Sequence, residues 1–182
     1  MQEQPNLKIP DVSTLAAKLR DIKDFPKPGI VFKDVTPLLA DSAALSLAVE
    51  LLTQPFRSLH IDKVVGAESR GFIFGTAVAR NLSAGFVPIR KPGKLPYKSV
   101  SQSYDLEYGK DRIEIHVDAV SHGQRVLLVD DVLATGGTMD AAVKLVRQVG
   151  GRVAATCFVI ELLFLNGRKR LGDVPVHSLV KY

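Results

Sequence analysis

The feature that most constrains this fold is a run of four apolar residues, Val126–Val129, which leads directly into Asp130 and Asp131. A short apolar run of this kind is typical of a parallel strand buried on both faces. A helical pattern then occupies residues 139–149 and ends at two glycines, a common stop signal for helices. We therefore predict a buried strand, a short loop and a crossover helix.

The loop between this strand and helix consists only of small residues. It lies where a strand ends and a helix begins, a position where ligands of open α/β sheets collect and free N–H groups favour an anion. Small residues let the backbone approach a phosphate, and the threonines add hydroxyl donors. The loop matches neither of the common nucleotide-binding patterns, G-x-x-x-x-G-K-[ST] and G-x-G-x-x-G. The residues predicted to bind phosphate are Ala134, Thr135, Gly136, Gly137 and Thr138.

The adjacent carboxylates indicate what accompanies the phosphate. Asp130 and Asp131 would repel a phosphate placed directly on them, but they suit the two vicinal hydroxyls of a ribose. Fixed negative charge beside a ribose that becomes positive during reaction would also stabilise the transition state. The alternative is an acidic surface turn that binds nothing.

This stretch resembles the signature with which type I phosphoribosyltransferases bind 5-phosphoribosyl 1-pyrophosphate (PRPP). Other blocks resemble the adenine phosphoribosyltransferase family, and the likeness covers roughly residues 12 to 182. It implies an α/β fold with a mostly parallel twisted sheet flanked by helices and a small amino-terminal hood over the base. It also implies purine salvage, in which PRPP and adenine give AMP and pyrophosphate. The additional blocks, in family order, are Pro28–Leu39, Gly66–Gly75, Ile89–Pro96 and Tyr104–Lys110.

The 182 residues are expected to form one phosphoribosyltransferase domain, because no repeat or long linker divides them. Residues of about 12–60 should form the hood and leading helices, and about 61–182 the PRPP-binding core with a flexible loop at 91–107. No apolar run reaches the roughly 18 residues of a membrane span, and the first residues do not resemble a signal peptide. Cys157 is the single cysteine and is predicted to be a buried thiol. We expect a cytoplasmic protein without a membrane partner.

Apolar periodicity predicts an alternation of helices and strands, which indicates a parallel sheet flanked by helices. A long polar loop is expected at 91–105. Helices are expected at 12–24, from Thr36 to about His60 with a break at Pro55, and at 72–82; strands are expected at 30–32, 63–65, 85–89, 112–118, 126–129, 153–160 and 175–181.

A second strand-to-helix turn, at residues 66–71, is predicted to form another anion pocket. Arg70 can make paired hydrogen bonds to phosphate oxygens. The resemblance implies that this is the pyrophosphate loop and assigns Glu68, Ser69, Arg70 and Gly71 to it. The alternative is an ordinary turn with an exposed arginine.

Three cations, Arg90, Lys91 and Lys94, open the predicted polar loop. A loop of this length in a compact domain is often a lid, and cations at its root suit a pyrophosphate leaving group. Lys91 is the main candidate. Arg90 either supports the local structure or reaches across a dimer, and Lys94 is equally well explained as a solvated charge.

The remaining site assignments rest on the resemblance. Glu107 is expected to exchange a proton with N7 of adenine as a general acid, because Ala134 stands where 6-oxopurine enzymes usually carry an aspartate; the alternative is a solvated glutamate. Val31 and Lys33 are placed in the hood over adenine, and Leu162 on the opposite face of the base. Backbone recognition suits a 6-amino group, since an unpaired buried polar group costs about 1–3 kcal/mol.

Magnesium is implied as the cofactor, bound mainly through substrate oxygens with few protein ligands. The spacing of the four histidines fits no metal site, so His60, His116, His122 and His177 are read as structural or surface residues. A homodimer is implied by the resemblance. The net charge of +5 would help to gather a polyphosphate, but the basic residues are scattered and carry no nucleic-acid motif. Two alternative functions remain open: transfer to another purine such as xanthine, and a non-catalytic regulator that senses PRPP.

Overall fold

A computed structural model describes residues 11–105 and 110–182 of the chain. The chain divides into two compact units, Met1–Ala48 and Val49–Tyr182. The division falls inside one helix, α3 (Ser42–Thr53).

The first unit contains a short antiparallel hairpin between two short helices. Arg20 opposes Asp34 in this hairpin, and its guanidinium Nη2 lies 2.6 Å from a carboxylate oxygen of Asp34. The helix predicted for residues 12–24 is therefore wrong beyond its first turns, because cross-strand pairing competes successfully with the weak helical pattern. The elements are α1 (Val12–Ala16), β1 (Arg20–Lys23), β2 (Val31–Asp34) and α2 (Thr36–Ala40).

The predicted helix from Thr36 to His60 is also interrupted at Asp41. The Asp41 carboxylate accepts hydrogen bonds from the backbone N–H groups of Ala43 and Ala44, which makes it the cap of α3. Pro37 occupies the first turn of α2, where its missing N–H costs nothing. The break at Pro55 is confirmed, because α3 gives way there to the 3₁₀ turn η1 (Gln54–Phe56).

The second unit is built on a five-stranded, fully parallel sheet in the order β4-β3-β7-β8-β9. The predicted parallel sheet is confirmed. Its strands are β3 (Lys63–Ala67), β4 (Gly85–Ile89), β7 (Arg125–Leu133), β8 (Arg152–Glu161) and β9 (Val176–Lys181).

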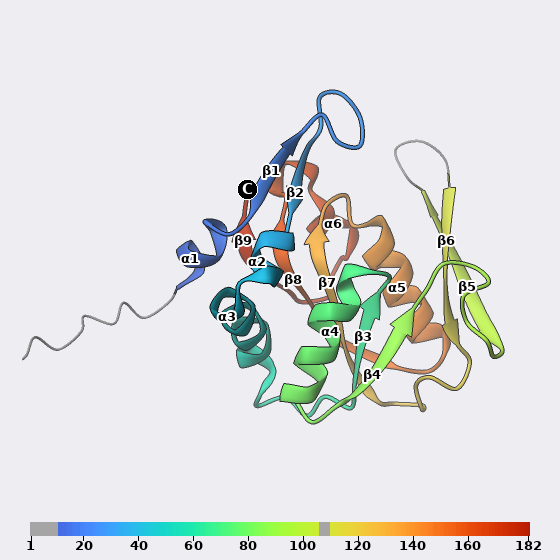
Figure 1. The fold of residues 1–182 in the computed structure, drawn as a ribbon. Coiled ribbons are helices and arrows are strands. Elements are labelled where there is room, and N and C mark those ends of the chain that lie inside the picture. Colours follow the sequence, from blue (N-terminus) through green and yellow to red (C-terminus); the bar gives the residue numbers. More distant parts are fainter. Residues whose placement is uncertain (1–10, 106–109) are drawn as a thin grey trace, which may run out of the picture. The chain divides into compact units, whose positions relative to one another are not determined.

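The two crossover helices of this unit leave the sheet in opposite directions. Helix α4 (Arg70–Asn81) leads from β3 to the edge strand β4, whereas α5 (Gly137–Gln148) leads from β7 toward β8. Because such crossovers are right-handed, the helices cover opposite faces of the sheet (Figure 1). The chain thus leaves the neighbouring strands β3 and β7 toward opposite faces at the point where the strand order reverses, which is where open α/β sheets bind ligands.

The core of the second unit lies on both faces of the sheet. Val65 and Leu128 belong to the apolar cluster that α5 completes, whereas Phe86 packs beside Gly75 of α4. All residues of the run Val126–Val129 are at most 1% exposed, which confirms the buried strand. Each such side chain contributes about 1.5–3 kcal/mol through burial. No helix among the residues described here is long and apolar enough to span a membrane.

Residues 99–105 form a strand rather than the expected polar loop. Strand β5 (Ser99–Asp105) pairs antiparallel with β6 (Lys110–His116), and the hairpin lies beside α5 (Figure 1). Its outer positions are serines, whereas Tyr104 on its inner face is only 7% exposed. The alternation was missed because the inner face includes Gln102 and therefore lacks an unbroken apolar pattern.

Candidate functional site

The predicted phosphate loop lies at the carboxyl end of β7, at the start of α5. Gly136 adopts a left-handed conformation with φ of +80°, which favours glycine. The first N–H groups of the twelve-residue helix α5 have no partner within the helix and are available to an anion. The loop and the end of β7 form a pocket lined by Asp130, Val132, Leu133, Ala134, Thr135, Gly136, Gly137, Thr138 and Met139.

The segment after β8 packs against this phosphate loop. It contains the 3₁₀ turn η2 (Leu163–Leu165) and the short helix α6 (Gly167–Arg170), and we call residues 162–170 the third loop. A Cβ atom on Gly167 would lie 2.2 Å from the carbonyl oxygen of Ala134, and one on Gly136 would lie 2.6 Å from the carbonyl oxygen of Gly167. Both contacts are backbone contacts, so neither can be relieved by rotating a side chain. Sequence reasoning missed Gly167, whose only local signal is a turn-like Asn-Gly pair.

An ion pair between buried Glu161 and half-exposed Arg168 anchors the third loop. Glu161 is 2% exposed and accepts from Arg168 through both oxygens, at 2.9 and 2.6 Å. The hydroxyl of Ser178 also donates to Glu161. The Arg168 hydrogen bonds hold the pKa of the Glu161 carboxyl below its ordinary value. The next residue, Leu162, donates its N–H to the carbonyl of Leu133 at 2.9 Å, which fixes this predicted base contact beside the end of β7.

The two aspartates of β7 have different partners. Asp131 is 5% exposed and forms an ion pair with Arg70, at the start of α4. Asp130 lies against Gly71, where an added Cβ would be 2.9 Å from its Oδ1 atom. Burial and the neighbouring charge of Asp131 raise the pKa of Asp130 well above its ordinary value. The structure therefore brings the two predicted anion loops together at the point where the strand order reverses.

Glu68 links the loop after β3 to the segment after β4. Its Oε2 atom accepts from the backbone N–H of Lys91 at 3.0 Å and from Nε of Arg90 at 3.2 Å. The hydrogen bond from Lys91 is the main reason that the pKa of Glu68 is lowered. The peptide bond between Glu68 and Ser69 is cis. Arg90 also donates to the carbonyl of Lys94 at 3.2 Å.

Lys91, the main cation predicted for pyrophosphate, forms an ion pair with Asp111 of β6. Tyr104 of β5 donates its hydroxyl to the same carboxylate at 3.0 Å. The hairpin is thus tied to the end of β4 by a charged contact.

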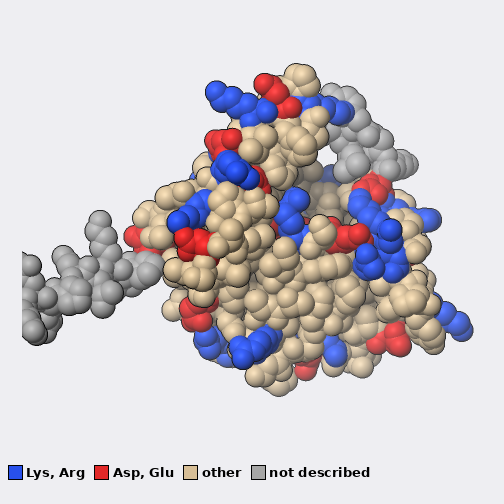
Figure 2. Space-filling view, in the orientation of Figure 1, with Lys and Arg blue, Asp and Glu red and all other residues tan. Residues whose placement is uncertain are grey.

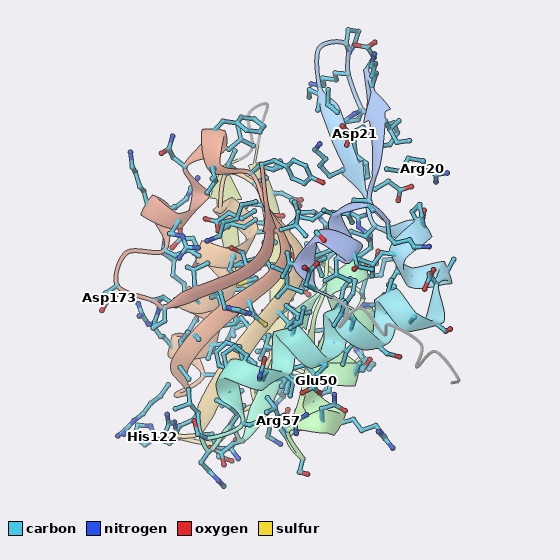
Figure 3. The ribbon with its side chains drawn as sticks, turned by 90° about the vertical axis from the view of Figure 1, so that its left-hand side faces the viewer. Arg20, Asp21, Glu50, Arg57, His122 and Asp173 are labelled. Carbon is cyan, nitrogen blue, oxygen red and sulfur yellow. The ribbon has the colours of Figure 1, made fainter. Side chains whose placement is uncertain are left out.

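The predicted hood residues lie on one face of the hairpin in the first unit. Val31 and Lys33 alternate along β2 and therefore share a face, and Val31 is 45% exposed. Nζ of Lys33 lies 2.7 Å from Asp21 of β1, which is labelled in Figure 3. Leu162 belongs to the other unit. Glu107 lies outside the described residues.

Within residues 11–105 and 110–182, no group of three or more His, Cys, Asp or Glu side chains could hold a metal ion. His177 lies 3.2 Å from the carbonyl of Leu51 and packs edge-on against Phe56. His122 lies beside Gly150, beyond the carboxyl end of α5 (Figure 3).

Cys157 is fully buried, as predicted, and burial raises the pKa of its thiol strongly. Figure 2 shows basic side chains interspersed with acidic ones over the face in view.

The chain matches the phosphoribosyl transferase domain family over residues 35–176. It is 59% identical over 166 residues to the adenine phosphoribosyltransferase of Bradyrhizobium sp. strain ORS 278, covering 90% of this chain and 93% of that protein. Among solved structures, it resembles adenine phosphoribosyltransferase from Rhodothermus marinus, with 53% identity and a TM-score of 0.90 over 94% of this chain and 98% of the other. It also resembles the Saccharomyces cerevisiae enzyme complexed with adenine and an imino-altritol bisphosphate, with 40% identity and a TM-score of 0.88 over 92% and 97% of the two chains.

Proposed function

Because the chain belongs to the adenine phosphoribosyltransferase family, we infer that it is an enzyme of purine salvage that converts adenine and PRPP to AMP and pyrophosphate. The observation that supports this most directly is the meeting of two anion loops, through Arg70 and Asp131, at the carboxyl edge of the sheet. PRPP carries a phosphate at C5 and a pyrophosphate at C1 of one ribose, and two neighbouring anion sites with carboxylates between them suit that shape.

We propose that the phosphate loop holds the 5′-phosphate. Backbone N–H groups at the start of α5 and the hydroxyls of Thr135 and Thr138 supply the donors, and the small residues Ala134, Gly136 and Gly137 permit close approach. Asp130 and Asp131 accept from the ribose hydroxyls and stabilise positive charge that develops on the sugar.

The leaving pyrophosphate is proposed to bind at the loop after β3 and the root of the hairpin. Ser69, Arg70 and Gly71 supply donors at the start of α4, and Lys91 supplies a further cation. Glu68 contributes indirectly, because its carboxylate orients Arg90 and the backbone of Lys91. Arg70 and Lys91 are both engaged by carboxylates in this structure, so each exchanges partners when pyrophosphate is bound.

Val31, Lys33 and Leu162 are each proposed to contact adenine, as the family resemblance implies. Val31 offers an exposed apolar surface for one face of the base. Glu107 is proposed to exchange a proton with N7 of adenine, which eases bond formation at N9.

We propose Mg²⁺ as the cofactor. The carboxylates of Asp130 and Asp131 are hard oxygen donors of the kind this ion prefers, and their small number fits an ion held mainly by substrate phosphates and water. When bound, Mg²⁺ neutralises charge on the polyphosphate. Asp130 would help to hold the ion, either directly or through the ribose hydroxyls.

The whole chain, residues 1–182, is proposed to act as one phosphoribosyltransferase domain with the hood at about 12–60 and the core at about 61–182. The flexible loop predicted at 91–107, of which the structure describes residues 91–105, is proposed to close the site over its substrates. A cytoplasmic homodimer without nucleic-acid or membrane partners is proposed on the same resemblance.

The test is AMP formation from PRPP and magnesium with adenine, and with hypoxanthine, guanine and xanthine in parallel. AMP from adenine alone is the expected result. Turnover of xanthine instead would retain the PRPP chemistry and reject the assigned base. Measurable PRPP binding without turnover of any base would favour a regulator, and salt-dependent nucleic-acid binding would then be the next assay.

A further inference from the structure

An acidic side chain lies directly beside the lysine assigned to pyrophosphate. The ammonium of Lys91 contacts the carboxylate of Asp111, and these side chains are 43% and 24% exposed. Although burial opposes it, the contact with Asp111 contributes to a raised pKa of Lys91, so the lysine stays charged. The positive charge of Lys91, which is proposed to bind pyrophosphate, is therefore already balanced by a carboxylate of the protein.

This acid is not needed to form the hairpin that carries it. Strands β5 and β6 pair along their whole length, and Ile113 and Ile115 of β6 are at most 3% exposed. Backbone pairing and apolar burial account for the stability of the hairpin.

A tyrosine holds the carboxylate in this position. Tyr104 stands opposite Asp111 in the hairpin and donates its hydroxyl to the same Oδ2 atom that contacts Lys91. Burial raises the pKa of the Tyr104 phenol, and the hydroxyl of Thr138, in the phosphate loop, opposes that rise. The phenol therefore remains a neutral donor between the two regions that bind the ends of PRPP.

We propose that Asp111 is a positioning residue that competes with pyrophosphate for Lys91 and thereby speeds the release of pyrophosphate. The ammonium leaves Asp111 when the polyanion binds and returns to it when the polyanion departs. No covalent step is involved. This inference rests on the proposed function, because it takes Lys91 to be a pyrophosphate ligand.

The direct experiment measures the dissociation constant of magnesium pyrophosphate by calorimetry and its inhibition constant in the adenine reaction. Asp111→Asn preserves the shape of the side chain and removes the charge. We expect about fivefold tighter binding, the scale of one partly exposed ion pair, together with a lower kcat if release limits turnover. Asp118→Asn is the matched control, because it removes the same charge from an exposed position just beyond the hairpin. It should change binding by less than about twofold.

A double-mutant cycle separates competition for Lys91 from a general electrostatic effect. In a Lys91→Met background, Asp111→Asn should no longer tighten pyrophosphate binding. Tyr104→Phe provides a second variant, since loss of the hydroxyl should release the carboxylate and tighten binding by about twofold.

The inference is overturned if Asp111→Asn weakens pyrophosphate binding or leaves it unchanged, or if the gain persists without Lys91. Wild-type protein assayed in the same preparation distinguishes this failure from a failure of the proposed function. Wild type that forms AMP, with no gain from Asp111→Asn, rejects only the role of Asp111. Wild type that forms no AMP rejects the proposed function itself.

Discussion

The two regions of the second unit that are proposed to bind anions are built in different ways. The phosphate loop consists of small residues, and the backbone of the third loop packs against it at Gly136 and Gly167. The pyrophosphate region consists of long charged side chains, each paired with a carboxylate: Arg70 with Asp131, Arg90 with Glu68, and Lys91 with Asp111.

This difference suits the groups that the two regions are proposed to bind, because one is retained in the product and the other is released. The 5′-phosphate is present in both substrate and product, so a rigid backbone site can hold it throughout the reaction. Pyrophosphate must be bound and then released. Carboxylates of the protein that pair again with Arg70 and Lys91 would favour this release. A preorganised site limits the entropic cost of binding, whereas an exchangeable site limits product affinity.

The largest expected effect tests whether either region supplies the proton for adenine. Glu107→Gln should lower kcat by about 10²-fold or more, the scale of general acid catalysis. Asp130→Asn should weaken the use of PRPP rather than alter the pH profile of kcat. Near-normal turnover in Glu107→Gln would reject the role assigned to Glu107.

The rigid character of the phosphate loop is tested by Gly167→Ala. The new Cβ would lie 2.2 Å from a backbone oxygen of the loop, so the loop must shift. A displacement of about 1 Å costs roughly 10²-fold in catalysis, and we expect kcat/KM for PRPP to fall by about that factor and AMP to bind more weakly.

Gly85→Ala is the matched control for this variant. There the added Cβ meets the flexible end of the Lys63 side chain, which can move away. Unchanged PRPP kinetics in Gly167→Ala, measured alongside this control, would show that the phosphate loop is not held rigidly by its neighbour.

Part of the fold and of the site can be predicted from the sequence alone. The central strands, the acid pair and the phosphate loop are predictable because each is encoded in consecutive residues, such as Val126–Val129 followed by Asp130. Strand β5 was missed because Gln102 interrupts its apolar face, and β1 because cross-strand pairing with β2 competes with a helical pattern.

The pairings within the site were beyond sequence reasoning for a different reason. Asp111 meets Lys91, and Gly167 meets Ala134, only after the sheet and hairpin have formed. A contact between residues twenty or more positions apart leaves no local signal in a single sequence. The types of residue in the site were therefore predictable, while their partners were not.

An intermediate effect tests the exchangeable region alone. Arg70→Lys keeps the charge but loses the planar guanidinium that pairs with two phosphate oxygens. We expect the KM for PRPP and the Kd for pyrophosphate to rise about tenfold, the loss of a charge-assisted hydrogen bond. AMP binding should stay within about twofold, because AMP lacks the pyrophosphate group.

Arg80→Lys, at the other end of α4, controls for a change in the helix itself. An equal loss of AMP and pyrophosphate affinity in Arg70→Lys would mean that the two regions do not act separately.

The smallest expected effect concerns the anchor of the third loop. Glu161→Gln removes the charge that Arg168 pairs with, and should lower the free energy of unfolding by about 1–2 kcal/mol, less than for a fully buried pair because Arg168 is half-exposed. That corresponds to a fall in Tm of about 3–6 °C. Glu50→Gln is the control, because its ion pair with Arg57 is exposed on both sides (Figure 3) and should contribute little.

The lowered pKa of Glu161 determines how the stability difference between wild type and Glu161→Gln changes with pH. The pKa of Glu161 is lowered in the folded protein, so its contribution is complete above the ordinary value of 4.5 and declines as pH falls below it. The stability difference between wild type and Glu161→Gln should therefore be largest at neutral pH and shrink below about pH 4.5. Thermal unfolding across this range measures it. A difference that is constant with pH would mean that the charge of Glu161 does not anchor the third loop.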